Sequence, residues 1–552
     1  MRPSALAALG PCLACLLATT SCVPAAAAAP RAGAGVGVAT SLEKLRPDDP
    51  LPAGRAITLA AARGECEAAQ VAVRAGARPV ALSAAAAPLA GPGRLEVTLY
   101  RVATIRLARG SGPEGEPGEW PDPLVPARDP YFGEARRAFP VRLEPGRLGA
   151  VWVEVCVPAA ARPGGYAGEV VLTDGDAPLA RVPVRVRVWP FALPPTPTFV
   201  AAAGLSTRLG TRALGAPDDV AVARALAAAA LRHRLSPYVL SADPPWGDCT
   251  AARCALDWTP LDAELAPVLD GTLVPGVRGG FAEVRIPGKV WDGPEADLAA
   301  TLLAWRRHFE ARGWADRLWL YVLDEPRPSD LPELRRRARL AHAAGIRVFV
   351  TAPPTPALAA VVDAWAPQER LATAAGPGAA SFSYTSCYSH GCDELPAGGR
   401  VRAAMQKEFS GWPGYVIDRP GTAARAVTWL GVVRGLSGSL YYDMLQAWTR
   451  DPWRDPRAFA GNGDGTLLYP GRPDALGGEH PFPVESIRLK VIRDALEDAE
   501  LLALAREAGL SAEVDAALAR LVPSARGWER RPGPWLAERA ALADALAART
   551  AR

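Results

Sequence analysis

The pattern of apolar residues changes once along this chain, at the proline-rich stretch LPPTPTF at residues 193–199. Before it, apolar and polar residues alternate with a period of two, which is typical of β-strands buried on one face. After it, short apolar runs alternate with longer segments of helical periodicity. Because prolines stiffen a connection, this stretch is a natural boundary between two architectures. A chain of 552 residues has room for about two to four domains.

Residues 36–193 are predicted to form one antiparallel β-sandwich. Gly, Pro and Asp punctuate the segment at short intervals, and no helical periodicity interrupts it. The alternating segments are QVAVRA, LEVTLYRVATIRL, GAVWVEVCVP, YAGEVVLTD and ARVPVRVRVWPF.

Residues 198–485 are predicted to form a (β/α)8 barrel, because apolar strand segments alternate with helical segments there. The strand segments are FVAAAGLS, PYVL, FAEVRI, LWLYVL, IRVFVT, VVDAW, SFSYTS and GSLYYD. The helical segments include VAVARALAAAALRHRL, DLAATLLAWRRHFEARG, DLPELRRRARLAHAAG and TAARAVTWLGVVRGL. The gap between IRVFVT and VVDAW leaves little room for a helix. Residues 486–552 are amphipathic, and we expect helices that pack on the barrel.

Residues 1–29 have the features of an export signal. Arg2 supplies a positive charge, and the apolar run at residues 5–18 is too short for a confident membrane span. Cys22, in LATTSC, resembles the lipidated cysteine of a bacterial lipoprotein, although Thr19 stands where Leu or Val is usual. Cleavage after the alanine run at residues 25–29 is the alternative. Either interpretation predicts an exported protein that is periplasmic, a cell-surface lipoprotein or secreted, with membrane attachment only through an N-terminal lipid.

The cysteines beyond the signal are even in number, which suggests disulfides in an exported chain. They are Cys66, Cys156, Cys249, Cys254, Cys387 and Cys392. Two pairs lie five residues apart in polar loops, so local bridges Cys249–Cys254 and Cys387–Cys392 are expected, which leaves Cys66 with Cys156. A zinc site is the rival interpretation, but the C-x4-C spacing and the scattered histidines disfavour it. We therefore predict no metal and no organic cofactor.

The strand LWLYVL runs directly into two carboxylates, Asp324 and Glu325, followed by Pro326. In a barrel this position is the C-terminal end of the fourth strand, where barrel enzymes place their chemistry. Pro326 disfavours helical geometry at Glu325, so we expect the chain to stay extended through the pair. The alternative is that Asp324 caps the next helix and Glu325 meets an arginine. Adjacent acids fit the usual two-carboxylate glycosidase poorly, and they better suit a mechanism in which the substrate's 2-acetamido group attacks.

Several motifs together resemble glycoside hydrolase family 123, the β-N-acetylgalactosaminidase-like proteins. The sandwich half contributes AARGECEAAQVAV, WPDPLVP, RPGGYAGEVVL and VRVWPFALP. The barrel half contributes LYVLDEP, VVDAW, SLYYD, GNGDGTLLYPG and SIRLKVIRDALEDAELL. The resemblance therefore spans nearly the whole chain after the signal. It implies a β-sandwich followed by a (β/α)8 barrel and a retaining, substrate-assisted mechanism.

The resemblance also implies residue roles. Asp324 would polarise the acetamido group, and Glu325 would be the general acid/base. Relatives often carry Trp-x-Tyr before the cysteine of the seventh strand, whereas this chain has Phe382 with Tyr384. Relatives often end the eighth strand with Tyr-Trp, whereas Tyr442 stands here. Both departures affect expected sugar-stacking positions and leave the specific sugar open.

Aromatic side chains near a barrel mouth can stack on sugar rings, although many of the 16 tryptophans must serve packing instead. Tyr384 and Trp448 are expected to face the same cleft as Glu325. The candidate substrate-binding residues are Tyr384, Trp448, Tyr442, Asp443, Trp365, Trp246, Trp291 and Tyr388.

The sequence supports an exported glycoside hydrolase that acts on β-linked N-acetylhexosaminides of a glycan or glycoconjugate. A non-catalytic carbohydrate-binding surface protein is one alternative. A conventional glycosidase with Glu325 as acid and Asp443 as nucleophile is another. The net charge of +4 is small and no basic block stands out, so no nucleic-acid partner is predicted.

Overall fold

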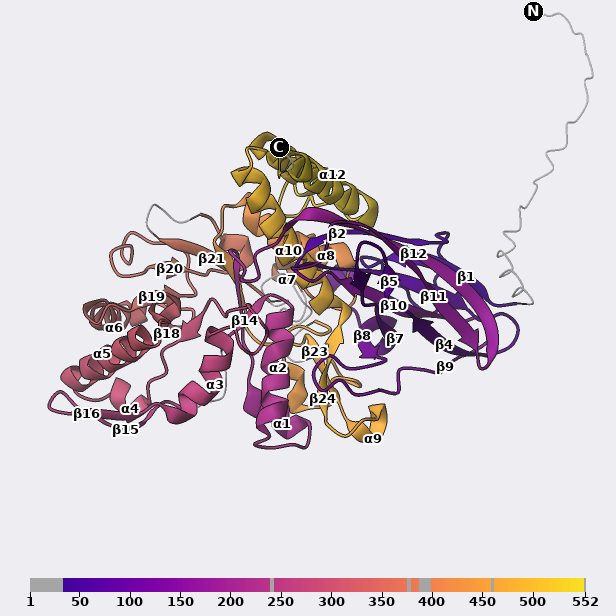
Figure 1. Ribbon diagram of the computed structural model, residues 1–552. Helices are drawn as coiled ribbons and strands as arrows, with labels where there is room; N and C mark the ends of the chain where they lie inside the picture. Colours follow the sequence, from indigo (N-terminus) through magenta and orange to yellow (C-terminus); the bar gives the residue numbers. More distant parts are fainter. Residues whose placement is uncertain (1–32, 239–242, 375–378, 387–398, 458–460, 551–552) are drawn as a thin grey trace, which may run out of the picture.

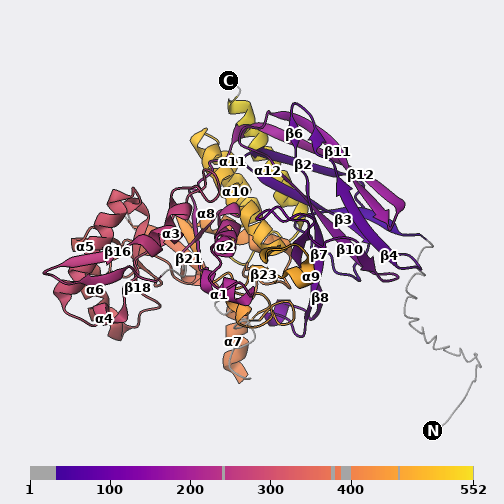
Figure 2. The same ribbon diagram turned by 60° about the horizontal axis from the view of Figure 1, so that its bottom comes forward.

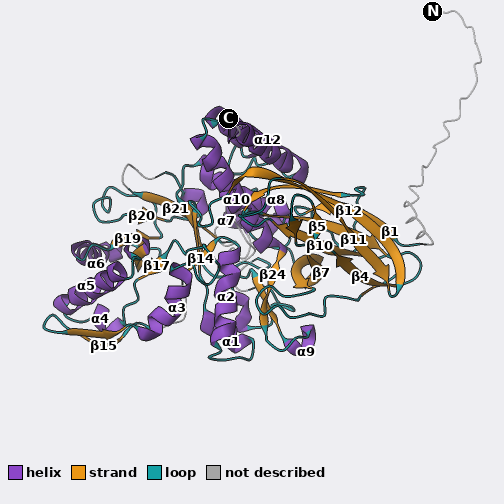
Figure 3. Cartoon of the chain, in the orientation of Figure 1, coloured by secondary structure: helices purple, strands orange, loops and turns teal. Residues whose placement is uncertain are grey.

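The computed structural model describes residues 33–238, 243–374, 379–386, 399–457 and 461–550. Figure 1 shows the β-rich N-terminal region on one side and an α/β region on the other. The C-terminal helices lie where the two regions meet, and Figure 3 shows the same division by secondary structure.

The N-terminal region contains two sheets that face each other, as the period-two segments predict, and their strands pair antiparallel except for one parallel pair in the second sheet. The first sheet contains β1 (Gly35–Thr40), β3 (Cys66–Arg74), β10 (Leu148–Cys156), β7 (Thr98–Leu107) and β8 (Gly118–Pro126) in that order. The second contains β2 (Ile57–Arg63), β12 (Ala177–Ala192), β11 (Gly164–Asp174), β4 (Val80–Ala86) and β9 (Val141–Leu143), with β5 (Leu89–Ala90) and β6 (Arg94–Leu95) beside β11. One apolar core joins both sheets, because Val71 and Val151 of the first pack with Val170 and Val184 of the second.

Two strands from the far end of the chain extend the first sheet. β24 (Phe482–Ser486) pairs antiparallel with β8, and β23 (Leu468–Gly471) pairs with β24. The predicted barrel segment, residues 198–485, thus includes strands that belong to the sandwich sheet. Pairing over more than three hundred residues leaves no local signal in the sequence, so the division into domains remains a prediction.

The second region contains eight parallel strands at the predicted positions. Their chain order is β13 (Val200–Ala203), β14 (Leu235–Pro237), β17 (Ala282–Glu283), β18 (Leu318–Leu323), β19 (Arg347–Val350), β20 (Ala364–Trp365), β21 (Ala380–Thr385) and β22 (Gly438–Tyr441). Each strand from β17 to β22 pairs with the next, and β22 returns to β13, which pairs with β14. This is the neighbour order of a (β/α)8 barrel.

The barrel prediction is confirmed only in part, because no backbone ladder joins β14 to β17 among the described residues. Side chains bridge this seam instead. The Gly280 backbone N–H donates to Ser236 Oγ at 2.8 Å, and Arg285 Nη2 donates to the Tyr238 carbonyl at 3.2 Å. The two edges are therefore neighbours without a regular ladder.

The predicted helices form at their expected positions. They are α2 (Val220–Arg232), α5 (Glu295–Ala311), α6 (Leu331–Ala343), α8 (Gly421–Val433), α10 (Ile487–Glu507), α11 (Ser511–Leu521) and α12 (Pro532–Thr550). Turns connect β19 to β20, as the short gap predicts. Additional short elements are α1 (Thr207–Ala213), α3 (Thr259–Leu269), α4 (Gly288–Trp291), α7 (Gly399–Phe409), α9 (Pro473–Leu476) and the hairpin β15 (Trp246–Cys249) with β16 (Cys254–Asp257). The hairpin packs on α5, and Figure 2 shows β16 beside that helix. Among the described residues, no helix combines the length and apolar character that crossing a bilayer requires.

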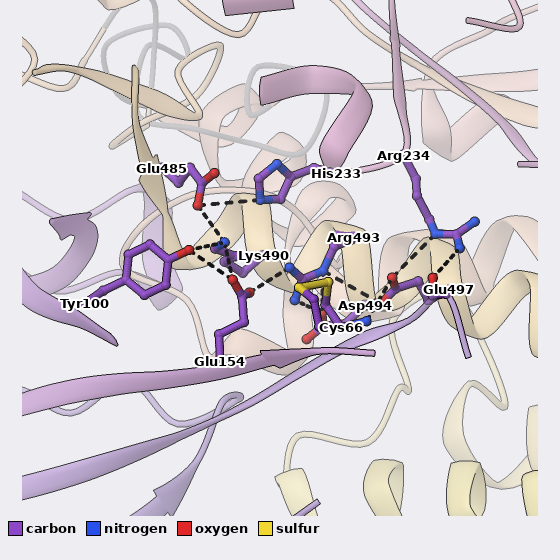
Figure 4. The surroundings of a disulfide bond; sticks show 12 residues. Cys66, Tyr100, Glu154, His233, Arg234, Glu485, Lys490, Arg493, Asp494 and Glu497 are labelled. Carbon is purple, nitrogen blue, oxygen red and sulfur yellow. Dashed lines mark hydrogen bonds and ion pairs between the residues drawn. A yellow bond between two sulfur atoms is a disulfide. The ribbon is translucent and has the colours of Figure 1, made fainter. Parts of the chain in front are cut away.

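Helix α10 lies between the sandwich and the parallel strands and is buried over most of its length, charged residues included. Lys490 forms ion pairs with Glu154 at 2.8 Å and with Glu485 at 2.5 Å. Arg493 Nη1 donates to Glu154 Oε1 at 2.6 Å. Figure 4 shows these residues beside the Cys66 disulfide. The helix is thus bound to the first sheet by paired charges.

The same helix is also bound to the strand region. Asp498 accepts two hydrogen bonds from Arg425 of α8, at 2.6 and 2.8 Å, and one from Trp429 at 2.8 Å. Glu500 accepts the Thr198 backbone N–H at 2.7 Å, where the proline-rich stretch enters β13. The C-terminal helices therefore contact more than the barrel, and α12 also packs on β12 of the sandwich.

Two of the expected disulfides are present, Cys66–Cys156 and Cys249–Cys254. The first joins β3 to β10, where the two cysteines stand opposite each other in the ladder. The second closes the β15–β16 hairpin. Cys387, Cys392 and Cys22 lie outside the described residues.

Removing the charge of Asp498 tests how much α10 depends on its ion pairs. Asp498→Asn leaves the Arg425 guanidinium buried without its counter-charge, which should reduce the free energy of unfolding by about 3–5 kcal/mol. Urea unfolding followed by circular dichroism measures this. Glu507→Gln, at an exposed position of the same helix, is the control and should change it by less than about 0.5 kcal/mol. Equal midpoints for both variants would show that the pair does not support the interface.

Candidate active site

The inside of the eight-stranded sheet is built in two layers, because side chains two residues apart on a strand share a face. The lower layer is a packed aromatic core that includes Phe281, Trp319, Phe349 and Phe382. Two residues further along the same strands stand Glu283, Tyr321, Thr351 and Tyr384. The upper layer is therefore polar and lies at the C-terminal ends of the strands, where barrel enzymes bind substrate.

Asp324 and Glu325 follow β18 directly and are exposed at this end of the sheet. Asp324 Oδ1 accepts hydrogen bonds from the Tyr321 hydroxyl at 2.7 Å and from Thr351 Oγ1 at 2.8 Å. Thr351 Oγ1 also accepts the Glu325 backbone N–H at 2.7 Å. One threonine hydroxyl on the neighbouring strand thus fixes both acids, while their carboxylates remain open to solvent.

The chain does not stay extended through the acidic pair, so that expectation is wrong. β18 ends at Leu323, and Glu325 has a φ of +42°, in the left-handed region. Pro326 disfavours the right-handed helical region but leaves the left-handed one open. The hydrogen bond from the Glu325 N–H to Thr351 holds this turn, which costs about 1–3 kcal/mol in a non-glycine residue. The turn redirects Glu325, which on a straight strand would point away from Asp324.

Tyr384 of β21 reaches the acidic pair, as the sequence predicts. Its hydroxyl donates a short hydrogen bond to Glu325 Oε1. The two acids are thus held by different partners, Asp324 by Tyr321 and Thr351, and Glu325 by Tyr384. This arrangement gives each carboxylate one fixed oxygen in a separate environment.

Further acids lie within electrostatic reach of the pair, around the buried Tyr238. Burial raises the pKa of the Tyr238 hydroxyl, and the negative charges of Glu283, Asp443 and Asp324 raise it further. Burial also raises the pKa of Glu283 to about 7, although Arg285 opposes this. The end of the sheet therefore gathers several acids in a partly dehydrated space.

Sequence reasoning missed Glu283, Tyr321, Thr351 and Tyr238 as members of this site. A signal for Glu283 was available, because a glutamate two residues after Phe281 in the strand FAEVRI must share its inward face. The contact of Thr351 with both acids depends on strand pairing and has no sequence signal.

Asp443 and Tyr442 lie at the end of β22, on the same side of the sheet. Burial raises the pKa of Asp443 to about 6, and the Leu445 and Met444 backbone N–H groups oppose this shift. The Leu445 N–H donates to Asp443 Oδ1 at 2.7 Å. Tyr442 packs against Gly465 of the glycine-rich loop, residues 461–467. A Cβ atom at Gly465 would overlap the Tyr442 hydroxyl. Both side chains are thus held at least partly by their own loops.

The tryptophan candidates lie elsewhere. Trp365 is buried in the core outside the sheet, and Trp291 packs under the Arg337 guanidinium at 4.2 Å. Trp448 is buried and lines a different cavity, with Nε1 bonded to the Leu468 carbonyl at 2.8 Å. No described contact joins it to Glu325. Trp246 begins the β15–β16 hairpin, and Tyr388 lies outside the described residues.

Among the described residues, no group of three or more His, Cys, Asp or Glu side chains is arranged to hold a metal ion. The chemistry available is that of carboxylates and tyrosine hydroxyls, which suits proton transfer and charge stabilisation.

Comparisons with known proteins bear on this arrangement. A model of the catalytic domain of glycoside hydrolase 123 matches residues 401–505. The structure is similar to that of a family 123 glycoside hydrolase from Clostridium perfringens, with a TM-score of 0.65 and 12% identity over 93% of this chain and 97% of that one. The resemblance to glycoside hydrolase family 123 is confirmed. The family 123 match contains β22, the glycine-rich loop and most of α10, whereas Asp324 and Glu325 lie outside it.

Other solved glycosidases are far less similar. A Bacteroides ovatus family 5 xyloglucanase gives a TM-score of 0.27 at 10% identity, over 84% of this chain and 100% of that one. A Bacteroides cellulosilyticus family 39 enzyme gives 0.31 at 9% identity, over 80% and 81%. Neither score supports an argument. No curated protein matches the sequence significantly. The two comparisons with family 123 support glycoside hydrolysis as the class of reaction, and they leave the sugar that is cleaved open.

The raised pKa of Glu283 makes a pH-dependent contribution to stability. Between about pH 4.5 and 7, the folded protein keeps a proton on Glu283 that the unfolded chain has released. Stability from this group therefore falls as pH rises through that window. When the pH is raised from 5 to 8, the free energy of unfolding of Glu283→Gln should rise by about 1 kcal/mol relative to that of wild type. Solvent screening at this half-buried group makes the change smaller than the pKa shift alone would give.

Thermal unfolding at both pH values measures this difference. The control is Glu96→Gln, at an exposed position, whose offset from wild type should be the same at both pH values. An unchanged offset for Glu283→Gln would contradict the assignment of a proton to this buried carboxyl.

Proposed function

We propose that this chain is an exported, retaining glycoside hydrolase that cleaves β-linked N-acetylhexosaminides with the help of the substrate's own 2-acetamido group. The observation that supports this most is the adjacent pair Asp324 and Glu325, held by different partners and exposed where parallel strands end. The eight strands in barrel order support a closed barrel, with side chains bridging the β14–β17 seam.

In this proposal Asp324 acts on the acetamido group. Two hydroxyl donors hold Oδ1, and Oδ2 makes no hydrogen bond within the described part of the chain. The free oxygen can accept the acetamido N–H, which turns the acetamido oxygen towards the anomeric carbon. As that oxygen attacks, positive charge develops on the acetamido nitrogen, and a nearby carboxylate stabilises it. Interactions that strengthen in this way accelerate the reaction rather than only binding substrate.

Glu325 is then the general acid and base. The Tyr384 hydroxyl fixes Oε1, and no described residue hydrogen-bonds Oε2. A proton on this carboxyl passes to the glycosidic oxygen as the bond to the leaving group breaks. The resulting carboxylate later takes a proton from the water that opens the cyclic intermediate, so the configuration at the anomeric carbon is retained.

The substrate class follows from the mechanism and from the relative. The Clostridium perfringens family 123 enzyme was described in connection with hydrolysis of glycolipid glycans. We extend this to a glycoconjugate substrate for the present chain. Two disulfides support an exported location, because such bonds persist in oxidising compartments. From the export signal expected at residues 1–29, we further propose that the protein is secreted, periplasmic or anchored to a membrane by an N-terminal lipid.

Substitutions of the acidic pair test the mechanism through the leaving group. Glu325→Gln should reduce kcat by at least about 10²-fold on substrates with poor leaving groups and far less on activated aryl glycosides, which need little protonation. Asp324→Asn should reduce kcat on substrates with poor leaving groups and on activated aryl glycosides alike, but only when the substrate carries the 2-acetamido group. Steady-state kinetics on matched aryl glycosides with and without that group measure this, and a thiazoline that mimics the cyclic intermediate should inhibit wild type.

Two outcomes would redirect the assignment. Equal turnover of glycosides with and without the acetamido group would exclude substrate assistance and favour Asp443 as a conventional nucleophile. Sugar binding without hydrolysis in wild type, unaltered by either substitution, would favour a binding protein.

Tyr384→Phe tests how far its hydroxyl positions Glu325. Without that hydrogen bond the carboxyl is free to rotate, and kcat on poor leaving groups should fall about 10- to 100-fold, which corresponds to one charge-assisted hydrogen bond. Activated substrates should be less affected, as for Glu325→Gln. The control is Tyr166→Phe, which removes a hydroxyl bonded to the Arg162 carbonyl in the sandwich. A loss confined to thermal stability would assign Tyr384 to packing alone.

A further inference from the structure

A cavity of about 710 Å³ lies away from the acidic pair. Its walls come from β7 of the sandwich, from α9, and from the loop that follows Asp443. The charged and aromatic residues that line it are Arg101, Trp448, Arg450, Asp451, Trp453, Arg454, Arg472 and Asp474. Arginines thus outnumber aspartates in its lining.

Arg101 is the unusual member of this cavity. It stands in the middle of β7, opposite Val151 on one side and Val125 on the other. Its guanidinium is half-buried, its Nε is buried without a hydrogen-bond partner, and burial lowers its pKa. No carboxylate in the described chain forms an ion pair with it. A buried charge without a partner costs free energy, so a fold has reason to keep one only where something else supplies the opposite charge.

The partners of the remaining arginines do not neutralise all of the positive charge in the cavity. Arg450 pairs with Asp455 at 2.7 Å, and Arg454 lies 3.6 Å from Asp451. Within the described part of the chain, Arg472 donates only to a backbone carbonyl, that of Ala213, at 2.8 Å. Arg450 and Arg454 also line an adjacent cavity of about 410 Å³, whose other lining residues include Arg106, Arg109 and Arg457. The positive field therefore extends over both cavities.

An aromatic side chain accompanies these charges. Trp453 is half-buried in the cavity wall, and its Nε1 is bonded to the Pro470 carbonyl at 3.0 Å. Tyr469 supports the indole ring, with centroids 5.2 Å apart. The indole fixed in this way offers an apolar surface on which a ligand ring can pack. The neighbouring guanidinium groups offer positive charge to an anionic substituent of that ring.

We propose that this arginine-lined cavity binds an acidic saccharide, whose carboxylate or sulfate group pairs with Arg101 while a sugar ring packs on Trp453. One loop connects it to the acidic pair's side of the sheet, because Asp443 is followed within eleven residues by Trp448, Trp453 and Arg454. The cavity is a binding site of its own, and it does not depend on the hydrolysis proposed for Asp324 and Glu325.

Isothermal titration of the full chain at low salt tests this, with three tetrasaccharides that lack the acetamido group and so do not report on the proposed hydrolysis. They are maltotetraose, its sulfated derivative and tetragalacturonate. At least one acidic probe should bind, neutral maltotetraose should not, and 0.5 M NaCl should weaken binding. Arg101→Gln should raise the dissociation constant about 10- to 100-fold, the value of one charge-assisted hydrogen bond. The control is Arg185→Gln, an exposed strand arginine of β12, which should leave it unchanged.

Three results would overturn the proposal. They are no binding of either acidic probe, equal binding to Arg101→Gln and wild type, and equal affinity for inorganic sulfate, which would mark a free-anion site.

Thermal unfolding of Arg101→Met without ligand adds an independent measurement. Because the variant removes an uncompensated charge but keeps the apolar stem, its midpoint should equal or exceed that of wild type. A clearly lower midpoint would instead show that Arg101 supports the fold.

Discussion

The buried ion pairs of α10 are the interaction on which the rest of this structure depends. Along one helix, Lys490 and Arg493 bind Glu154 of the sandwich, while Asp498 binds Arg425 of α8. Charges this deeply buried are tolerated only when each has its partner in place. The helix therefore fits one relative position of the two regions, and any other position would leave several charges unpaired. These ion pairs thus connect the strand region to the sandwich through α10.

The candidate site is built on that fixed frame by the pairing of neighbouring strands. Thr351 directly follows β19, and its hydroxyl binds both Asp324 and the backbone of Glu325 after β18. The aromatic layer beneath, from Phe281 to Phe382, fills the inside of the sheet and sets the level at which polar side chains begin. The left-handed turn at Glu325 brings together two adjacent acids that would diverge on a straight strand. The chemistry that we propose for the pair would thus depend on a local backbone strain that the Thr351 hydroxyl holds.

Many elements were predictable because their signals are local. All eight strand segments follow the periodicity of apolar residues, and so do the helices α2, α5, α6, α8, α10, α11 and α12. The Cys249–Cys254 disulfide follows from short spacing in a polar hairpin. The acidic pair was predictable from its position after a buried strand. The attachment of β23 and β24 to the sandwich sheet was not, because β24 pairs with a strand more than three hundred residues earlier. Trp448 was expected beside Glu325 and instead lines the arginine-rich cavity, since a tryptophan's side of a loop is not encoded in its spacing.

The sequence by itself determined the order and type of the elements, the place of Asp324 and Glu325 at a strand end, and the resemblance to family 123. These depend on hydrophobic periodicity and on residues that are neighbours in the chain. Only the tertiary structure decided that Glu283 lies within electrostatic reach of Tyr238, that Thr351 holds both acids, and that Arg101 has no counter-charge in the described chain. Each of these depends on which strands pair and which faces are buried, and such contacts arise from the free energy of the whole chain rather than from any single segment.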